Sequence, residues 1–220
     1  MLQLHYFPGN ASLIPHIVLE ELGVPFELKY VDRAVAAHKS ADYLALNPNG
    51  LIPVLVETGN GGAANPLVLY ETLAVCLHLA DTHPAAALMP PPGSAERAQA
   101  YKRLIWLTNT LQATLIVYFY PERWADDAEA IAQVKAHAET KVGTMLDQLD
   151  AEFARHGAPW LLGDAFGLAD IYAMVLCRWT RGLGRPARDL PHLKPWLDRI
   201  LERPATQRAF ATEKLPPPRV

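Results

Sequence analysis

The sequence predicts an α/β domain followed by an all-α domain. Three observations lead to this: alternating apolar residues at the start of the chain, apolar residues at helical spacing throughout the second half, and a proline-rich stretch between them. The chain has 220 residues, half of them apolar, which is enough for two domains with cores of their own. We therefore expect domains at residues 1–83 and 94–220, joined by a linker at 84–93.

The chain opens with a strand, a helix and a second strand. Residues 2–6 alternate as in a strand, and apolar residues at 13–22 then repeat at helical spacing up to Gly23, a residue typical of helix ends. Residues 26–31 read as a strand again. Because a helix separates the two strands, they are expected to pair in parallel.

The rest of the first domain contains two more strands. A short helix is expected at 39–46, strands at 52–57 and 67–70, and a helix at 71–83. The glycine-rich TGNGG at 58–62 is typical of a hairpin, so the last two strands are expected to be antiparallel. The order βαβ(α)ββα is that of a thioredoxin-like domain.

The linker and the second domain are marked by proline and by helical periodicity. HPAAALMPPPGS (83–94) suits neither a helix nor the interior of a sheet, which makes it the boundary. Beyond Ser94, a plausible N-cap, apolar residues keep helical spacing in four stretches. These are 94–120, 126–156, 169–181 and 194–210, the last interrupted by Pro204.

Composition excludes several classes of partner. Twenty basic and 23 acidic side chains leave a net charge of −3, which indicates no attraction to nucleic acid or to an anionic membrane. The start lacks a basic region followed by an apolar stretch, so we expect a cytoplasmic protein. Cys76 and Cys177 lie in apolar helical patterns and are expected to be buried and reduced, and no His or Cys spacing suggests a metal site.

Four motifs in this order resemble the cytosolic glutathione transferases, most closely bacterial sequences of the beta and related classes. They are YFPGNASLIPHIVLEELGVPFEL (6–28), KSADYLALNPNGLIPVL (39–55), LYETLAVCLHLAD (69–81) and WLLGDAFGLADIYA (160–173). The resemblance covers nearly the whole chain. It implies a thioredoxin-like domain joined to a helical bundle, assembled as a homodimer, with glutathione as co-substrate.

The resemblance assigns the glutathione-binding residues. It implies that Pro53 is cis, which lets the backbone of Ile52 pair with the cysteinyl amide; the alternative is an ordinary trans strand start. Glu71 and Thr72 match the acid and hydroxyl that bind the γ-glutamyl amino and carboxyl groups. The alternative is a simple helix start, with Glu71 stabilised by the helix dipole. Lys39 is implied to reach the glycyl carboxylate, and a solvated lysine is the alternative.

The glutathione sulfur would then lie over the first turn of the helix at 13–22, where the first helical amides are expected to be free. Lowering a thiol pKa from about 8.5 to about 6.5 requires about 2.7 kcal/mol. One donor to the thiolate supplies about 1.5 to 3 kcal/mol, and a helix N-terminus supplies about 0.3 to 1 kcal/mol. The beta-class cysteine is replaced by Ala11, so we rank three possible donors, in the order Ser12, Asn10, Tyr6.

The second domain is expected to line the acceptor pocket. Trp106, Asn109 and Gln112 match the helix that does so in the family, although the beta class tends to have a histidine near Gln112. They are equally consistent with ordinary helix-face residues. An apolar acceptor pocket or the core would contain the aromatic residues Tyr118, Tyr120, Trp124 and Trp179. Asp170 resembles the family's helix-capping acid, with Gly167 in place of its usual Ser or Thr partner.

The function predicted from these motifs is an enzyme, a glutathione S-transferase that uses the glutathione thiolate on small hydrophobic electrophiles. Two alternatives remain: a non-catalytic regulatory or scaffolding dimer, supported by the missing loop cysteine, and a glutathione-dependent isomerase, dehalogenase or peroxidase. The complete γ-glutamyl motif at Glu71 and Thr72 favours an enzyme, because a scaffold has no physical reason to keep it.

Overall fold

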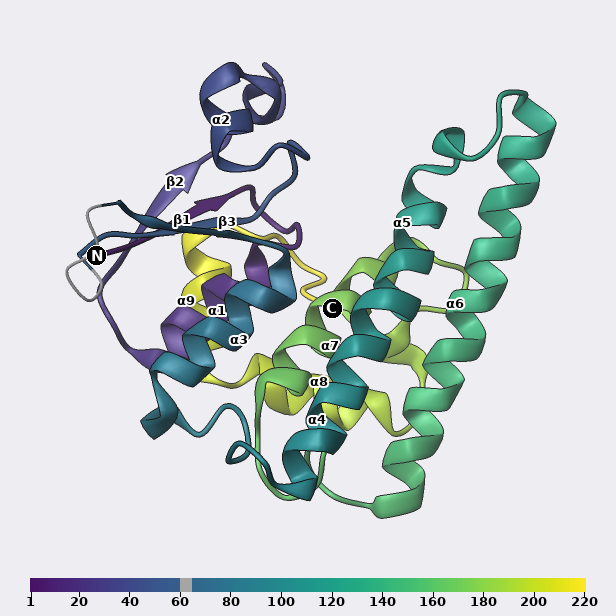
Figure 1. Cartoon of the computed structure of the whole chain (residues 1–220). Helices are drawn as coiled ribbons and strands as arrows, with labels where there is room; N and C mark the ends of the chain where they lie inside the picture. The colour runs from purple at the N-terminus through teal and green to yellow at the C-terminus, as the bar shows by residue number, and fades with distance from the viewer. Residues whose placement is uncertain (60–64) are drawn as a thin grey trace. The chain divides into compact units, whose positions relative to one another are not determined.

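The computed structural model describes residues 1–59 and 65–220, and it contains two compact units (Figure 1). Unit 1 comprises Met1–Leu88 and Glu202–Pro216, and unit 2 comprises Met89–Leu201 and Pro217–Val220. The sequence assigned all of 94–220 to the second domain. Residues 202–216 instead belong to unit 1, because the helix they contain packs on the first helix of the chain.

Unit 1 is built on a four-stranded mixed sheet in the order β2-β1-β3-β4. The strands are β1 (Leu2–Tyr6), β2 (Phe26–Tyr30), β3 (Val54–Glu57) and β4 (Leu67–Tyr70). As predicted, β1 and β2 are parallel and β3 and β4 are antiparallel; β1 and β3 are also antiparallel. The expected hairpin at 58–62 falls partly on residues 60–64, which lie outside the described residues.

Four helices cover this sheet. They are α1 (Leu13–Leu22), α2 (Ala41–Leu46), α3 (Thr72–Thr82) and α9 (Pro204–Thr212). Helices α1, α3 and α9 lie on one side of the sheet and α2 on the other (Figure 1). The fully buried side chains of Leu4, Leu13, Ile17, Leu55 and Leu79 form much of the core. Helix α1 ends as predicted at Gly23, whose φ of 65° places it in the left-handed region.

Two ion pairs connect α9 to α1. Arg203 makes a bidentate pair with Glu21: Nε donates to Oε1 at 2.6 Å and an Nη donates to Oε2 at 2.8 Å. Arg208 Nε lies 2.5 Å from Glu20 Oε2. The two basic residues come from the end of the chain and the two acids from its first helix. These ion pairs add to the packing of α9 on α1, although the two helices are remote in sequence.

Unit 2 is all-α, as predicted. It contains α4 (Ala95–Trp106), α5 (Ala113–Phe119), α6 (Ala128–His156), α7 (Leu168–Trp179) and α8 (Leu193–Leu201). Helices α4 and α5 are joined by a π-helical segment, η3 (Leu107–Gln112), so the helix expected at 94–120 is interrupted in backbone geometry. Short 3-10 segments complete the chain: η1 (Ala37–Lys39), η2 (Pro84–Ala86), η4 (Pro121–Arg123), η5 (Thr180–Gly182) and η6 (Ala187–Asp189).

Helix α7 is the centre of unit 2, as its apolar sequence predicts: every residue from Leu168 to Arg178 is buried. Asp170 keeps the capping role expected of it, because Oδ2 accepts the Gly167 amide at 3.0 Å. Oδ1 accepts the Leu161 amide at 2.8 Å and the Trp196 indole N–H at 2.9 Å. Within the described part of the chain, no helix is long and apolar enough to cross a membrane.

Candidate functional site

The candidate residues of unit 1 meet at one end of its sheet. Strand β1 ends at Tyr6 beside the last residue of its parallel neighbour, Tyr30. At the same end β3 begins with Val54, which pairs with Tyr70, the last residue of β4. Three segments adjoin this end of the sheet: residues 7–12, where the sulfur is expected and which we call the thiol loop, the segment with Pro53 before β3, and the start of α3.

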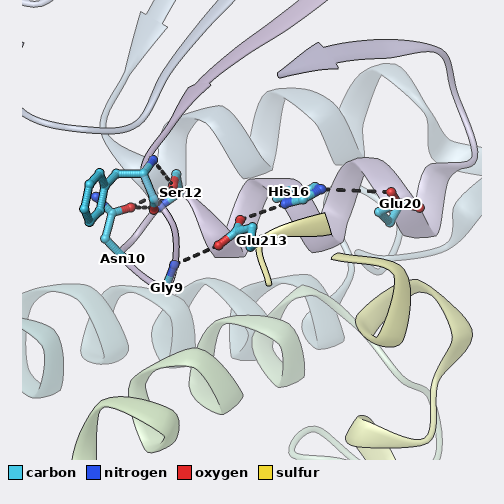
Figure 2. A network of polar contacts seen from close by, with 7 residues as sticks. Gly9, Asn10, Ser12, His16, Glu20 and Glu213 are labelled. Atoms are coloured by element: carbon cyan, nitrogen blue, oxygen red, sulfur yellow. Dashed lines mark hydrogen bonds and ion pairs between the residues drawn. The ribbon is translucent and has the colours of Figure 1, made fainter. Parts of the chain in front are cut away.

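The hydroxyl of Ser12 is buried in the loop before α1 and bonded to that loop. Oγ accepts the Phe7 amide at 3.1 Å and lies 2.7 Å from Asn10 Oδ1 and 3.1 Å from Phe7 O. Ser12 and Asn10 face one another in Figure 2. Since a hydroxyl has a single proton, the shorter distance identifies Asn10 as its main acceptor. Ser12 does not cap α1 with its side chain.

The first amides of α1 also have partners, contrary to the expectation that they are free. Asn10 Oδ1 accepts the Ser12 amide at 2.8 Å, and Asn10 O accepts the Leu13 amide at 3.1 Å. The Ile14 amide donates to Ala11 O at 3.2 Å. Within the described residues, two donors of this loop have no acceptor in the protein, the backbone N–H of Ala11 and the side-chain Nδ2 of Asn10. The loop therefore satisfies most of its own hydrogen bonds, and only these two N–H donors are available to a ligand.

A buried acid from α9's end holds the same loop, and sequence reasoning missed it. Glu213 Oε2 accepts the Gly9 amide at 2.7 Å, and Oε1 lies 2.7 Å from His16 Nδ1, with both side chains fully buried. On its other edge, His16 Nε2 is 3.9 Å from Glu20 Oε1 (Figure 2). The φ of Gly9, 72°, lies in the left-handed region that favours glycine. The one local signal was a histidine within the apolar face of α1.

Tyr6 is turned toward α1. Its ring centroid lies 6.3 Å from that of His16 and 6.0 Å from that of Tyr30, both edge-to-face. Burial raises the Tyr6 pKa, and the Glu213 carboxylate and Tyr30 raise it further. The phenol is therefore a weaker acid than usual.

The start of α3 has the features of an anion site. Glu71 precedes the helix with a φ of 68°, which is unusual for a residue with a side chain, and its carboxylate is exposed. The Thr72 side chain is buried, and no side chain caps the helix. Such a strained junction is typical of ligand sites, because the surrounding fold must hold it in place.

The loop before β3 is fixed by its own polar contacts. The Ile52–Pro53 bond is cis, as the resemblance implied. Leu51 O accepts the Tyr43 hydroxyl at 2.9 Å and the side-chain Nδ2 of Asn47 at 2.8 Å. Lys39 Nζ donates to two backbone carbonyls of the same loop, Asn49 O at 3.3 Å and Gly50 O at 3.2 Å.

The three candidates of unit 2 lie on α4 and η3. Trp106 packs against Arg103, whose Cζ is 5.3 Å from a Trp106 ring centroid. Asn109 is exposed and accepts the Thr108 hydroxyl at 3.3 Å. Gln112 Oε1 accepts the hydroxyl of fully buried Tyr172 at 2.6 Å, which gives this side chain a structural role within unit 2.

Cys76 and Cys177 are buried and unpaired, as expected. Burial raises the pKa of both thiols, that of Cys177 to about 12. Neither is therefore a nucleophile in the folded protein. Over residues 1–59 and 65–220, no group of three or more His, Cys, Asp or Glu side chains is placed to hold a metal ion.

Comparison with known proteins identifies the family of the chain. Models of the glutathione S-transferase N-terminal and C-terminal domains match residues 11–82 and 108–204. Glutathione S-transferase GST-4.5 of Xanthomonas campestris is 31% identical over 97% of this chain and its own full length. A sphingomonad glutathione S-transferase complexed with glutathione is 35% identical (TM-score 0.81), covering 97% of this chain and 100% of its own.

A bacterial beta-class enzyme from Sphingomonas chungbukensis is 32% identical (TM-score 0.80), over 97% of this chain and 100% of its own. The two family models match parts of both units. This chain belongs to the glutathione S-transferase family.

Proposed function

We propose that the protein is a glutathione transferase that binds glutathione at the sheet end of unit 1 and activates its thiol at Asn10. The observation that carries the proposal is the meeting of the thiol loop, the cis-Pro53 segment and the strained Glu71 at one end of the sheet. That arrangement offers contacts for each part of the tripeptide. The alternative of a scaffold predicts no glutathione binding there.

The γ-glutamyl group is placed at the start of α3. The Glu71 carboxylate is an acceptor for the ammonium group, while the Thr72 hydroxyl and the first amides of α3 are donors for the carboxylate. The backbone of Ile52 pairs with the cysteinyl amide. Lys39 already donates to two carbonyls, and its ammonium has a third N–H for the glycyl carboxylate.

The thiolate is assigned to Asn10 rather than to Ser12, which reverses the order inferred from sequence. Because Ser12 Oγ and N both bind Asn10 Oδ1, the amide is oriented with Nδ2 directed away from them. Asn10 Nδ2 and Ala11 N are then available to the sulfur. One such bond to a charged group contributes about 1.5 to 3 kcal/mol, enough for most of the shift required. Ser12 is the positioning residue.

The reaction proposed is conjugation. The thiolate attacks an electrophilic carbon of a small hydrophobic acceptor, a C–S bond forms, and the leaving group departs with the bonding electrons. Trp106, Asn109 and Gln112 remain candidates for acceptor contacts, and a cytoplasmic homodimer remains the proposed working form. The glutathione-dependent isomerase, dehalogenase or peroxidase reactions would use the same thiolate.

The test is a pH titration of the thiolate ultraviolet absorbance of bound glutathione. We expect Asn10→Ala to raise the thiol pKa by about 1 to 2 units, since it loses one hydrogen bond to the anion. Ser12→Ala should give a smaller rise, through loss of Asn10 orientation, yet should reduce conjugation more than Tyr6→Phe does. Calorimetry with glutathione measures binding separately.

Two results would contradict the proposal. A pKa unchanged in Asn10→Ala but raised in Ser12→Ala would return the donor role to Ser12. No heat of glutathione binding, together with no retention on glutathione-agarose, would leave the scaffold as the better account.

A further inference from the structure

Next to the thiol loop, unit 1 has an aromatic surface that the proposed glutathione contacts do not use. The rings of Phe7 and Tyr30 are stacked, with centroids 6.0 Å apart and an interplanar angle of 27°. Tyr30 is 56% exposed although it ends a strand of the sheet. Two stacked rings at the surface provide a flat apolar contact for another planar group.

A cation is held on this surface. Arg33 Cζ lies 5.4 Å from the Phe7 ring centroid, a distance at which the guanidinium and the ring attract one another. The turn carrying Arg33 is closed by the Ala34 amide, which donates to Asp32 Oδ1 at 2.8 Å, and by the Ala36 amide, which donates to Arg33 O at 3.1 Å. A guanidinium has five N–H donors, so an anionic ligand can add to contacts that Arg33 already makes.

The surface is tied to the thiol-binding residues. Phe7 N donates to Ser12 Oγ, and Phe7 O accepts the Asn10 amide at 3.3 Å. Reacting atoms must approach to about 3 to 3.5 Å. Because the Phe7 backbone is bonded to both Ser12 and Asn10, we take the Phe7 ring as the part of this surface that an acceptor attacked by a sulfur at Asn10 would meet.

The local charge favours an anion. Lys39 and His38 follow Arg33 in the same connection, and the His38 pKa is lowered by burial and by the positive charges of Lys39 and Arg33. Asp32 provides a carboxylate, which is bonded to its own turn.

We propose that the acceptor is a planar aryl electrophile with a carboxylate or similar anionic substituent, recognised by Phe7, Tyr30 and Arg33. This inference rests on the proposed function, because it needs glutathione thiolate at Asn10. In the reaction the sulfur attacks the ring carbon that bears a halide. The C–S bond forms, the halide leaves with the bonding electron pair, and the thiol proton goes to solvent.

The test compares two acceptors that differ mainly in charge, 1-chloro-2,4-dinitrobenzene and 4-chloro-3,5-dinitrobenzoate. The measured quantity is the ratio of kcat/KM for the carboxylate to kcat/KM for the neutral compound, at low ionic strength. We expect Arg33→Met, which keeps a long apolar side chain, to lower this ratio about tenfold, the loss of one charged hydrogen bond. Arg33→Lys should restore part of this ratio, because lysine returns the positive charge but not the planar, bidentate guanidinium.

Arg199→Met is the matched control. Arg199 is also stacked on an aromatic ring, with Cζ 5.6 Å from Trp160, but it lies on α8 in unit 2. Its loss should leave the ratio unchanged. The inference is overturned if Arg33→Met leaves the ratio unchanged, or if Arg199→Met lowers it equally, while glutathione still binds. If calorimetry shows no glutathione binding, the proposed function fails first, and this inference fails with it.

Discussion

In the proposed function, Ser12 and Asn10 share the role in thiol activation that the sequence assigned first to Ser12. Both side chains lie in the turn before α1, but the Ser12 hydroxyl is buried and points into the loop. Asn10 is only partly buried, and its side-chain oxygen Oδ1 accepts the Ser12 backbone amide. A hydroxyl that is needed to shape the loop is a poor choice for the thiolate, whereas the amide end of Asn10 keeps its donors.

Glu71 offers a second test at the scale of one residue. Replacement by Ala should raise the KM for glutathione about tenfold or more, because the γ-glutamyl ammonium loses a charged acceptor. Circular dichroism should show an unchanged fold. Glu71→Gly removes the same carboxylate but tolerates the φ of 68°, so it should be about 1 kcal/mol more stable than Glu71→Ala in urea unfolding.

Comparing Glu71→Ala with Glu71→Gly separates the effect of the carboxylate on glutathione binding from the effect of backbone strain on stability. A normal KM in both would show that the carboxylate does not bind glutathione. Equal stability of the two would show that the backbone at this position is not strained.

At the scale of secondary structure, α9 joins the end of the chain to α1. Arg203 and Arg208 pair with Glu21 and Glu20 along the helix, and Glu213 follows it and reaches His16 and Gly9. The last contact differs from the others because both of its side chains are fully buried. A buried pair is costly to break, since the partner left behind has no water to replace it.

Glu213→Ala should therefore destabilise the protein by about 3 kcal/mol. Glu213→Gln should cost less, because its carbonyl oxygen still accepts the Gly9 amide. Arg208→Ala is the control on the same helix: the Arg208 side chain is 53% exposed, and removing an exposed ion pair costs at most about 1 kcal/mol. Urea unfolding followed by circular dichroism measures all three, and similar losses for Glu213→Ala and Arg208→Ala would contradict this account of α9.

For the whole molecule, local patterns predicted most of the fold. Strand alternation, the helix-ending Gly23 and the run of prolines after His83 each act on neighbouring residues, so the order of strands and helices follows from them. The pairings of β1 with β2 and of β3 with β4 followed in turn, because a crossover helix requires parallel strands and a short connection requires antiparallel ones. The antiparallel pairing of β1 with β3 was not predicted.

What the sequence did not reveal depends on contacts between distant residues or on side-chain direction. His16 and Glu213 are separated by 197 positions, and no local pattern indicates that they meet. The inward hydroxyl of Ser12 is set by the three-dimensional turn, and the π segment at Leu107–Gln112 has no composition of its own. Motif similarity selected the candidate binding residues, whereas packing determines which of their hydrogen-bond donors have no partner within the loop.

The most direct test of the central claim is a crystal structure of the protein soaked with glutathione. The account predicts the γ-glutamyl carboxylate at the first amides of α3, and the sulfur within hydrogen-bond distance of Asn10 Nδ2. A sulfur bonded to Ser12 Oγ with Asn10 turned away, or glutathione bound away from the sheet end of unit 1, would contradict it.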